Sequence, residues 1–223
     1  MNWFLYLSLS FILVSYLCSL RIFGLKASSP ELHYLLRAFS YFLLFAFLAE
    51  CFGIAWPRKI YLFTPFARSN QWFYNIFHFL SYLFYLWFFL RVLPLPGIKK
   101  AVRILSFIYL LVALINFTFI QGPLQLNTFT DLLACFIMVF LSIAYYYQLL
   151  YAKEIVPLQR DPIFWISTGL LIYHLGSMMG LFLINVMNVI SNEKARNIHF
   201  IIQFSAVLMY INYSIAFVCM KKK

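Results

Sequence analysis

The feature that most constrains this chain is a succession of long apolar runs that carry very little charge. Each run is near the ~20 residues that an α-helix needs to cross a ~30 Å hydrocarbon layer. Backbone N–H and C=O groups in lipid must be paired within their own segment, so these runs are predicted to be helices and not strands. The seven runs are Trp3–Leu20, Leu32–Trp56, Trp72–Leu93, Ala101–Phe119, Phe129–Tyr151, Ile163–Val186 and Phe200–Met220.

The scarcity of charge excludes a soluble domain of this length. Of the 223 residues, 65% are hydrophobic and only 10% are charged, which is too few to cover a water-exposed surface. There is no Gly/Ser-rich linker, low-complexity tract or obvious repeat that would divide the chain. The sequence therefore predicts an all-α polytopic membrane protein, a seven-transmembrane-helix bundle that forms a single domain over residues 1–223.

The basic residues predict a lipid partner. The formal net charge is +11, but Lys and Arg stand singly at the ends of the apolar runs. That distribution favours contact with anionic headgroups of the lipid bilayer and indicates no nucleic-acid partner. Met1-Asn2-Trp3 lacks the basic start of a signal peptide, so the first run is expected to remain as a helix.

The distribution of Lys and Arg also predicts the orientation. Twelve of the 17 lie in the odd-numbered connections, near their helix ends, or in the tail. By the positive-inside rule this richer side faces the cytoplasm, which puts the N-terminus outside and the C-terminus in the cytoplasm. The five on the poorer side are Arg58, Lys59, Arg68, Lys194 and Arg196.

Two helix starts carry recognisable signals. Ser29-Pro30-Glu31 supplies a capping hydroxyl, a proline at the first helical position and an acid in the first turn. Asp161-Pro162 offers the same combination of a capping oxygen and a proline before the sixth run. We therefore expect the second and sixth helices to begin at these prolines.

Polar side chains within the apolar runs are the candidate functional residues, because an ionisable group costs at least ~2.5–3.5 kcal/mol at the centre of a membrane helix. Glu50 and His78 each lie about six residues, or ~9 Å, below the outer ends of their helices. We predict that a polar layer lines a cavity open to the outside, with Glu50 and His78 at its floor. Its candidate ligand-binding residues are Glu50, Asn75, His78, Asn116, Asp131, His174, Asn185 and Gln203.

Each of these residues also has a purely structural interpretation. Asp131 lies three residues after Thr128 and could be the acid of a capping box. The amides at 75, 116, 185 and 203 could be interhelical hydrogen-bond partners, worth about 0.6–2 kcal/mol each. His174 could be a satisfied residue of the bundle interior. Glu50 needs a partner or a neutralised carboxyl, so it is the strongest candidate.

Small residues in the sixth run predict close helix packing. Gly176 and Gly180 form a GxxxG pattern, which permits close approach of another helix, and Gly169 lies two turns earlier. With Tyr173 they are expected to form the central seam of the bundle. The four cysteines, Cys18, Cys51, Cys135 and Cys219, lie singly inside apolar runs and are interpreted as packing residues.

Motifs for catalysis, metal binding or phosphate binding are not found in the sequence. HExxH, Gly-x-Ser-x-Gly and a phosphate-binding Gly loop do not occur, and the four histidines lack metal-ligand spacing. The last run holds no Lys for a retinal Schiff base. We therefore expect no cofactor, no metal and no assigned catalytic residue.

Two segments carry a family resemblance. NQWFYNI (Asn70–Ile76) leads into the aromatic third run, and RDPIFWISTGLLIY (Arg160–Tyr173) opens the sixth. With the spacing of the runs, they resemble a group of bacterial seven-helix membrane proteins found fused to, or encoded near, sensor histidine kinases. The resemblance implies an extracytoplasmic sensing role in the bacterial inner membrane and no catalytic residues. Many relatives have an acid in the third helix where this chain has His78.

Three functions are compatible with the sequence. The leading hypothesis is a membrane sensor or signal-coupling protein, which acts through a separate partner such as a histidine kinase because only three residues follow the last run. The alternative is a small proton-linked transporter or channel that uses Glu50 and His78. An intramembrane enzyme acting on lipid would require Glu50, His78 and Asp131 to converge on one point.

Overall fold

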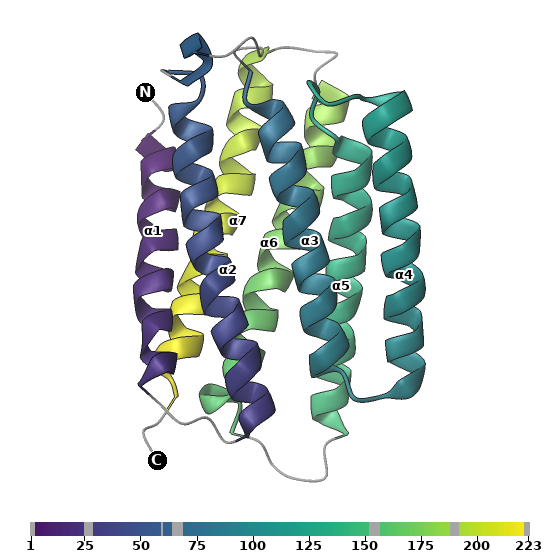
Figure 1. Cartoon of the computed structure of the whole chain (residues 1–223). Helices are drawn as coiled ribbons and strands as arrows, with labels where there is room; N and C mark the ends of the chain where they lie inside the picture. The colour runs from purple at the N-terminus through teal and green to yellow at the C-terminus, as the bar shows by residue number, and fades with distance from the viewer. Residues whose placement is uncertain are drawn as a thin grey trace.

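The structure is a computed structural model, and it describes residues 3–24, 29–58, 60–63, 69–151, 157–187 and 192–220. All secondary structure in these segments is helical (Figure 1). Short 3₁₀ turns follow α1 and α2 and precede α6. The long helices are α1 (Trp3–Ser19), α2 (Pro30–Ala55), α3 (Gln71–Val92), α4 (Pro96–Ile115), α5 (Thr128–Leu150), α6 (Pro162–Met187) and α7 (Asn192–Val218).

The seven predicted helices are confirmed. Seven helical segments of the described chain are long and apolar enough to cross a membrane. α1 begins at one end of the bundle and α7 ends at the opposite end, as an odd number of antiparallel spans requires (Figure 1). We refer to these as the α1-start end and the α7-finish end; which of them faces the cytoplasm stays a prediction.

Both predicted helix starts are confirmed. Ser29 Oγ accepts a hydrogen bond from the Leu32 N–H at 3.2 Å, and α2 begins at Pro30. Asp161 Oδ1 accepts from the Ile163 N–H at 2.9 Å, and α6 begins at Pro162. The second carboxylate oxygen of Asp161 accepts from the Tyr145 hydroxyl, which ties the start of α6 to α5.

Two helices begin earlier than their apolar runs. α4 begins at Pro96, not Ala101, and α7 begins at Asn192, not Phe200. The added segments include charged residues such as Lys99, Lys100 and Lys194, so a search for uninterrupted hydrophobicity left them out although a helix tolerates them beyond the hydrocarbon layer. α4 also ends in a π-helical turn, Asn116–Ile120, in which the Asn116 carbonyl accepts from the Gln121 N–H at 3.0 Å.

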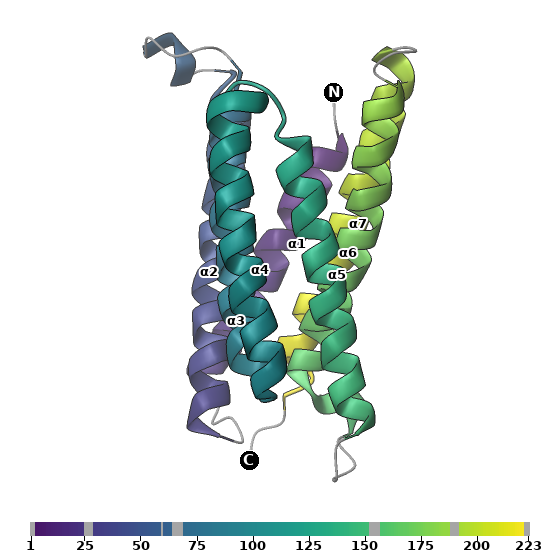
Figure 2. The ribbon, with the colours of Figure 1, turned by 90° about the vertical axis from the view of Figure 1, so that its right-hand side faces the viewer.

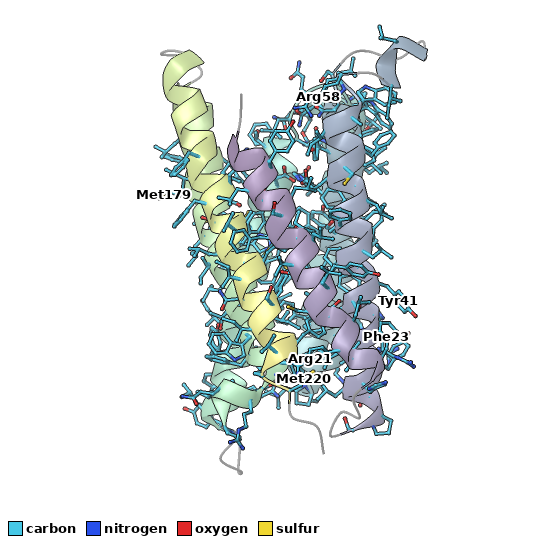
Figure 3. All side chains as sticks on the ribbon, turned by 90° about the vertical axis from the view of Figure 1, so that its left-hand side faces the viewer. Arg21, Phe23, Tyr41, Arg58, Met179 and Met220 are labelled. Carbon is cyan, nitrogen blue, oxygen red and sulfur yellow. The ribbon has the colours of Figure 1, made fainter. Side chains whose placement is uncertain are left out.

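The helices form two groups that separate towards the α1-start end. Figure 2 shows α6 and α7 inclined away from α2, α3 and α4, with α1 and α5 between the two groups. Figure 3 shows the same inclination from the other side, with Arg58 at the open end and Arg21 and Met220 at the closed end. There the Arg21 guanidinium donates to the Val218 carbonyl at 3.1 Å.

The predicted small-residue seam lies between α6 and α7. A Cβ added at Gly169 would lie 3.0 Å from the Met209 carbonyl oxygen, and one at Gly176 would lie 2.7 Å from Ser205 Cβ. Gly180 is also buried. The glycines therefore let α7 approach α6, but this seam lies on one side of the bundle and not at its centre, because α2 and α3 belong to the other group (Figure 2).

Aromatic side chains close the bundle towards the α7-finish end. Phe39 of α2 is fully buried, and its ring centroid lies 5.5 Å from that of Phe88 on α3 and 4.9 Å from that of Tyr213 on α7. Phe89 and Phe217 are fully buried in the same core. We call Phe39, Phe88, Phe89, Tyr213 and Phe217 the aromatic cluster. It holds α2, α3 and α7 together at this end of the bundle, whereas the helix groups separate at the open end.

Candidate functional site

A cavity of about 460 Å³ occupies the space between the two helix groups. Its walls come from α2 and α3 on one side and α6 and α7 on the other, with Ser8 and Ile12 of α1 at one edge. Its lining extends from Arg58, at the α1-start end, down to Tyr85 and Met209 above the aromatic cluster. The cavity is therefore open at one end of the bundle and has a floor near its middle.

One stripe of α3 supplies much of the lining. Gln71, Tyr74, His78, Tyr82 and Tyr85 all line the cavity, and their spacing of three or four residues puts them on one face of the helix. This stripe carries the polar groups deepest into the cavity on the α2–α3 side. Its residues explain why the third run is so rich in tyrosine and why that richness is not spread evenly around the helix.

Glu50 of α2 projects into the cavity and is held by α3. The Tyr74 hydroxyl donates to Glu50 Oε2 at 3.0 Å. Tyr74 can come this close because Gly53, one turn after Glu50, has no side chain; a Cβ there would lie 2.5 Å from the Tyr74 oxygen. Among the described residues no Lys, Arg or His lies within ion-pair distance of Glu50.

His78 is paired with the acid of α5. His78 Nδ1 lies 3.3 Å from Asp131 Oδ2, and the His78 side chain is 30% exposed while that of Asp131 is 7% exposed. Asp131 therefore orients His78, and the imidazole presents its other edge to the cavity. The capping-box interpretation of Asp131 is wrong, because its carboxylate binds His78 and the Thr128 hydroxyl accepts from Gln121 Nε2 instead.

His174 of α6 lies at the floor of the cavity. It is fully buried, and neither ring nitrogen has a hydrogen-bond partner in the part of the chain that the structure describes. The rings of Tyr82, Tyr85 and Tyr173 surround it at centroid distances of 5.6, 6.3 and 4.9 Å. A buried imidazole without a partner forfeits a hydrogen bond, and a polar group from a molecule in the cavity would bond to it once the neighbouring side chains shift, because both nitrogens are covered.

The predicted polar layer is divided between two roles. Glu50, His78, His174 and Gln203 line the cavity. Asn75 does not: its amide donates to the Pro123 and Gln125 carbonyls at 3.0 and 2.8 Å. Asn116 donates to Gln121 Oε1 and Thr130 Oγ1, both at 2.9 Å. Asn75 and Asn116 thus hold the α4–α5 connection, whereas the Asn185 side chain lies outside the residues whose side chains are described.

Asp131 also borders a second hollow on the far side of α3. This apolar groove of about 620 Å³ lies between α3, α4 and the start of α5, and it is lined mainly by exposed apolar side chains such as Phe107, Leu110 and Leu114. Asn75 and Asp131 lie along it. The His78–Asp131 pair therefore separates the polar cavity from a groove suited to hydrocarbon.

The sequence reasoning missed the tyrosines of the cavity wall. Tyr82, Tyr85, Tyr173 and Tyr210 line the cavity together with Phe42 and Phe77. Only the spacing of the α3 tyrosines could have indicated this, because aromatic residues are frequent throughout the chain. In the described segments no group of three or more His, Cys, Asp or Glu side chains could hold a metal ion.

Comparison of the chain with protein-family models, with curated proteins and with solved structures finds no match. What the site can do must therefore be argued from its chemistry. Among the described residues it combines one carboxylate, one acid-oriented imidazole, one imidazole without a hydrogen-bond partner and a wall of phenol rings, all lining one cavity. Glu50 and His78 line the same cavity, and His78 contacts Asp131 at 3.3 Å.

Proposed function

We propose that this protein is a ligand sensor of the bacterial cytoplasmic membrane, whose cavity opens to the extracytoplasmic side and whose output passes through a separate partner. The observation that carries the proposal is the cavity itself, which is polar and aromatic, open at one end and floored by an unpartnered imidazole at His174. Ligand pockets typically combine apolar walls with a few converging polar groups in this way.

The arrangement of the helices supports a signalling mechanism. α6 and α7 are close to each other along their glycine seam, and α7 meets α2 and α3 at the aromatic cluster. A ligand that bridges the two helix groups would draw α6 and α7 towards α2 and α3 at the open end, with the aromatic cluster as the fulcrum. The movement would change the surface that α7 and its neighbours present to a partner such as a histidine kinase.

Accessibility of the cavity to aqueous reagents tests the proposal. In a chain with the four native cysteines replaced by alanine, Gln203→Cys places a thiol in the cavity wall, and Met179→Cys places one on the outer surface of α6, where Met179 is 59% exposed (Figure 3). We expect a membrane-impermeant thiol reagent added to intact cells to label the first variant and not the second. Labelling of Gln203→Cys from the cytoplasmic side alone would contradict the proposal.

Signalling is tested by the transcriptional response of the host. Deletion of the gene should alter the output of a two-component system encoded nearby, and the wild-type chain should restore it. A chain whose cavity is filled by Ser81→Trp should fail to restore it although it reaches the membrane. Unchanged output of every neighbouring system after deletion would rule out the sensing role.

A proton-linked transporter is the second candidate. It is favoured by the succession of ionisable groups along the cavity wall, from Glu50 through the His78–Asp131 pair towards His174. Such groups can relay protons when they lie along a substrate path. A pH-driven flux in proteoliposomes that is lost in Glu50→Gln would favour this function over sensing.

A further inference from the structure

The charge balance of the cavity identifies the kind of ligand it would take. Glu50 is the only carboxylate among the described residues that line it. Asp131 does not line the cavity and contacts His78 instead. The Tyr74 hydroxyl donates a hydrogen bond to one oxygen of Glu50. No Lys, Arg or His of the described chain lies within 4 Å of either Glu50 oxygen. The carboxylate is thus held in place by a neutral donor and has no counter-charge within 4 Å among the described residues.

Two basic side chains that also line the cavity, Arg58 and His78, are engaged elsewhere. Arg58 lies at the mouth, where its guanidinium donates to the Ile54 carbonyl at 3.3 Å and lies over the Tyr6 ring at 5.7 Å. His78 is paired with Asp131. His78 acts on Glu50 only through space, from beyond 4 Å, and both Arg58 and His78 have partners that would compete with an anionic ligand.

The walls around Glu50 are built from rings that attract cations. Phe42, Phe77, Tyr85, Tyr173 and Tyr210 face the same cavity. The face of an aromatic ring carries partial negative charge and stabilises an ammonium group within about 6 Å by ~0.5–2 kcal/mol. A carboxylate among several such faces is the usual chemistry for recognition of an amine or a quaternary ammonium, and the membrane interior strengthens each attraction by excluding water.

We propose that the cavity binds a small organic cation, an amine or quaternary ammonium with an apolar body, whose positive charge lies against Glu50 and whose body lies among the tyrosine rings above His174. This inference rests on the proposed function, because it assigns a ligand class to the same extracytoplasmic cavity.

The test compares three probes of matched shape and different charge. 2-Phenylethylamine, 2-phenylethanol and phenylacetate share a ring and a short side chain but are cationic, neutral and anionic at neutral pH. Binding to the purified full-length protein in nanodiscs is measured by titration calorimetry and by the shift in unfolding temperature. We expect the amine to bind most tightly, and Glu50→Gln to weaken it by about ten- to hundredfold while leaving the neutral probe unchanged.

A matched carboxylate on the same helix provides the control. Glu31 lies in the exposed first turn of α2, at the end opposite the cavity mouth, so Glu31→Gln removes the same charge without touching the site. It should leave amine binding unchanged. If Glu50→Gln does not fold, the three probes still rank the preference of the unaltered protein, and Glu50→Asp retains the charge for comparison.

Three outcomes would overturn the inference. Preferential binding of phenylacetate would show an anion site governed by Arg58 or His78. Equal binding of all three probes, unaffected by Glu50→Gln, would show an apolar site without charge selection. Failure of 2-phenylethylamine and of the quaternary benzyltrimethylammonium ion to bind at all would remove the ligand class, while thiol labelling of Gln203→Cys would still decide separately whether the cavity opens outside.

Discussion

The His78–Asp131 contact joins α3 to α5 through side chains that are largely removed from solvent. A buried pair of this kind is held by mutual attraction, and removal of one partner leaves the other with the full cost of its lost solvation. Because Asp131 is the more buried of the two, the cost of leaving it alone should exceed the cost of leaving His78 alone.

We therefore expect His78→Leu to lower the free energy of unfolding by about 3 kcal/mol and Asp131→Leu to lower it by less. The double variant should be more stable than the sum of the single effects predicts, because no unpaired group remains. Reversible unfolding in mixed micelles measures all three. Additive losses would show that the two side chains do not interact in the membrane.

Gly53 controls the position of the Tyr74 hydroxyl. A methyl group at residue 53 would overlap the phenol oxygen and its ring carbon, at 2.5 and 2.6 Å. Tyr74 would have to turn away from Glu50, so the carboxylate would lose its one described hydrogen-bond donor.

Gly53→Ala should thus behave like Tyr74→Phe in any measurement of Glu50, with an added packing cost of about 1–3 kcal/mol. A suitable measurement is the affinity for 2-phenylethylamine in the two variants and in their combination. We expect the combined variant to bind no more weakly than Gly53→Ala alone. A further loss in the combination would mean that Gly53 acts on the site by another route.

At the scale of helices, the α6–α7 pair depends on its small residues. At Gly176 any side chain would meet Ser205 of α7, and at Gly169 it would meet the backbone and side chains of α7. Gly97 in the first turn of α4 has open space around it. It therefore serves as a control, a helical glycine where an added Cβ would have no neighbour within 4 Å.

Gly176→Leu is expected to destabilise the folded protein by several kcal/mol or to force α7 away from α6, whereas Gly97→Leu should change stability by less than about 1 kcal/mol. Cysteine crosslinking between α6 and α7 gives the direct measurement, because a displaced α7 loses its crosslink. An unchanged crosslinking yield in Gly176→Leu would show that the seam adapts without separation of the helices.

The helices were largely predictable from the sequence, apart from the early starts of α4 and α7. α2 and α6 begin at the prolines that the capping signals indicated, because caps are local and legible in sequence. α4 begins five residues early because Lys99 and Lys100 interrupt an apolar run without interrupting a helix. Hydrophobicity indicates which residues lie in lipid, whereas the ends of a helix are set by how far its backbone hydrogen bonds extend.

The sequence predicted how deep the candidate site residues lie along their helices but not towards which neighbouring helix each side chain points. The rise per residue placed Glu50 and His78 at one level, and they do share a cavity. Asn75 was expected in the same polar layer as His78, but three residues leave a rotation of ~60° about the axis. That rotation turns Asn75 to the α4–α5 connection. Which side of α3 meets which neighbour depends on long-range packing, and one sequence does not state it.

At the scale of the whole molecule, the helices make a wedge: the aromatic cluster joins α2, α3 and α7 at one end, and the cavity separates them at the other. The Lys and Arg distribution predicts that the separated end is extracytoplasmic. Residues Arg58 and Gln121 belong to connections at that end, whereas Gly24 and Leu95 belong to connections at the other.

Reporter fusions should therefore divide the connections into two sets. Alkaline phosphatase, which is active only outside the cytoplasm, should be active when fused after Gln121 and inactive when fused after Leu95. A fluorescent protein that folds only in the cytoplasm should give the opposite result at each position. The reverse pattern would place the mouth of the cavity in the cytoplasm and would remove the basis for extracytoplasmic sensing.

The floor beneath His174 has a consequence for sidedness. In the described chain, the cavity lining stops above the fully buried rings of Phe39 and Tyr213, so a solute that arrives through the mouth finds no described passage to the α7-finish end. Vesicles in which the protein is inserted in both directions would then hold two populations, and a membrane-impermeant solute added outside would saturate only one. The other would respond once the bilayer is breached, so occupancy alone would report the direction of insertion.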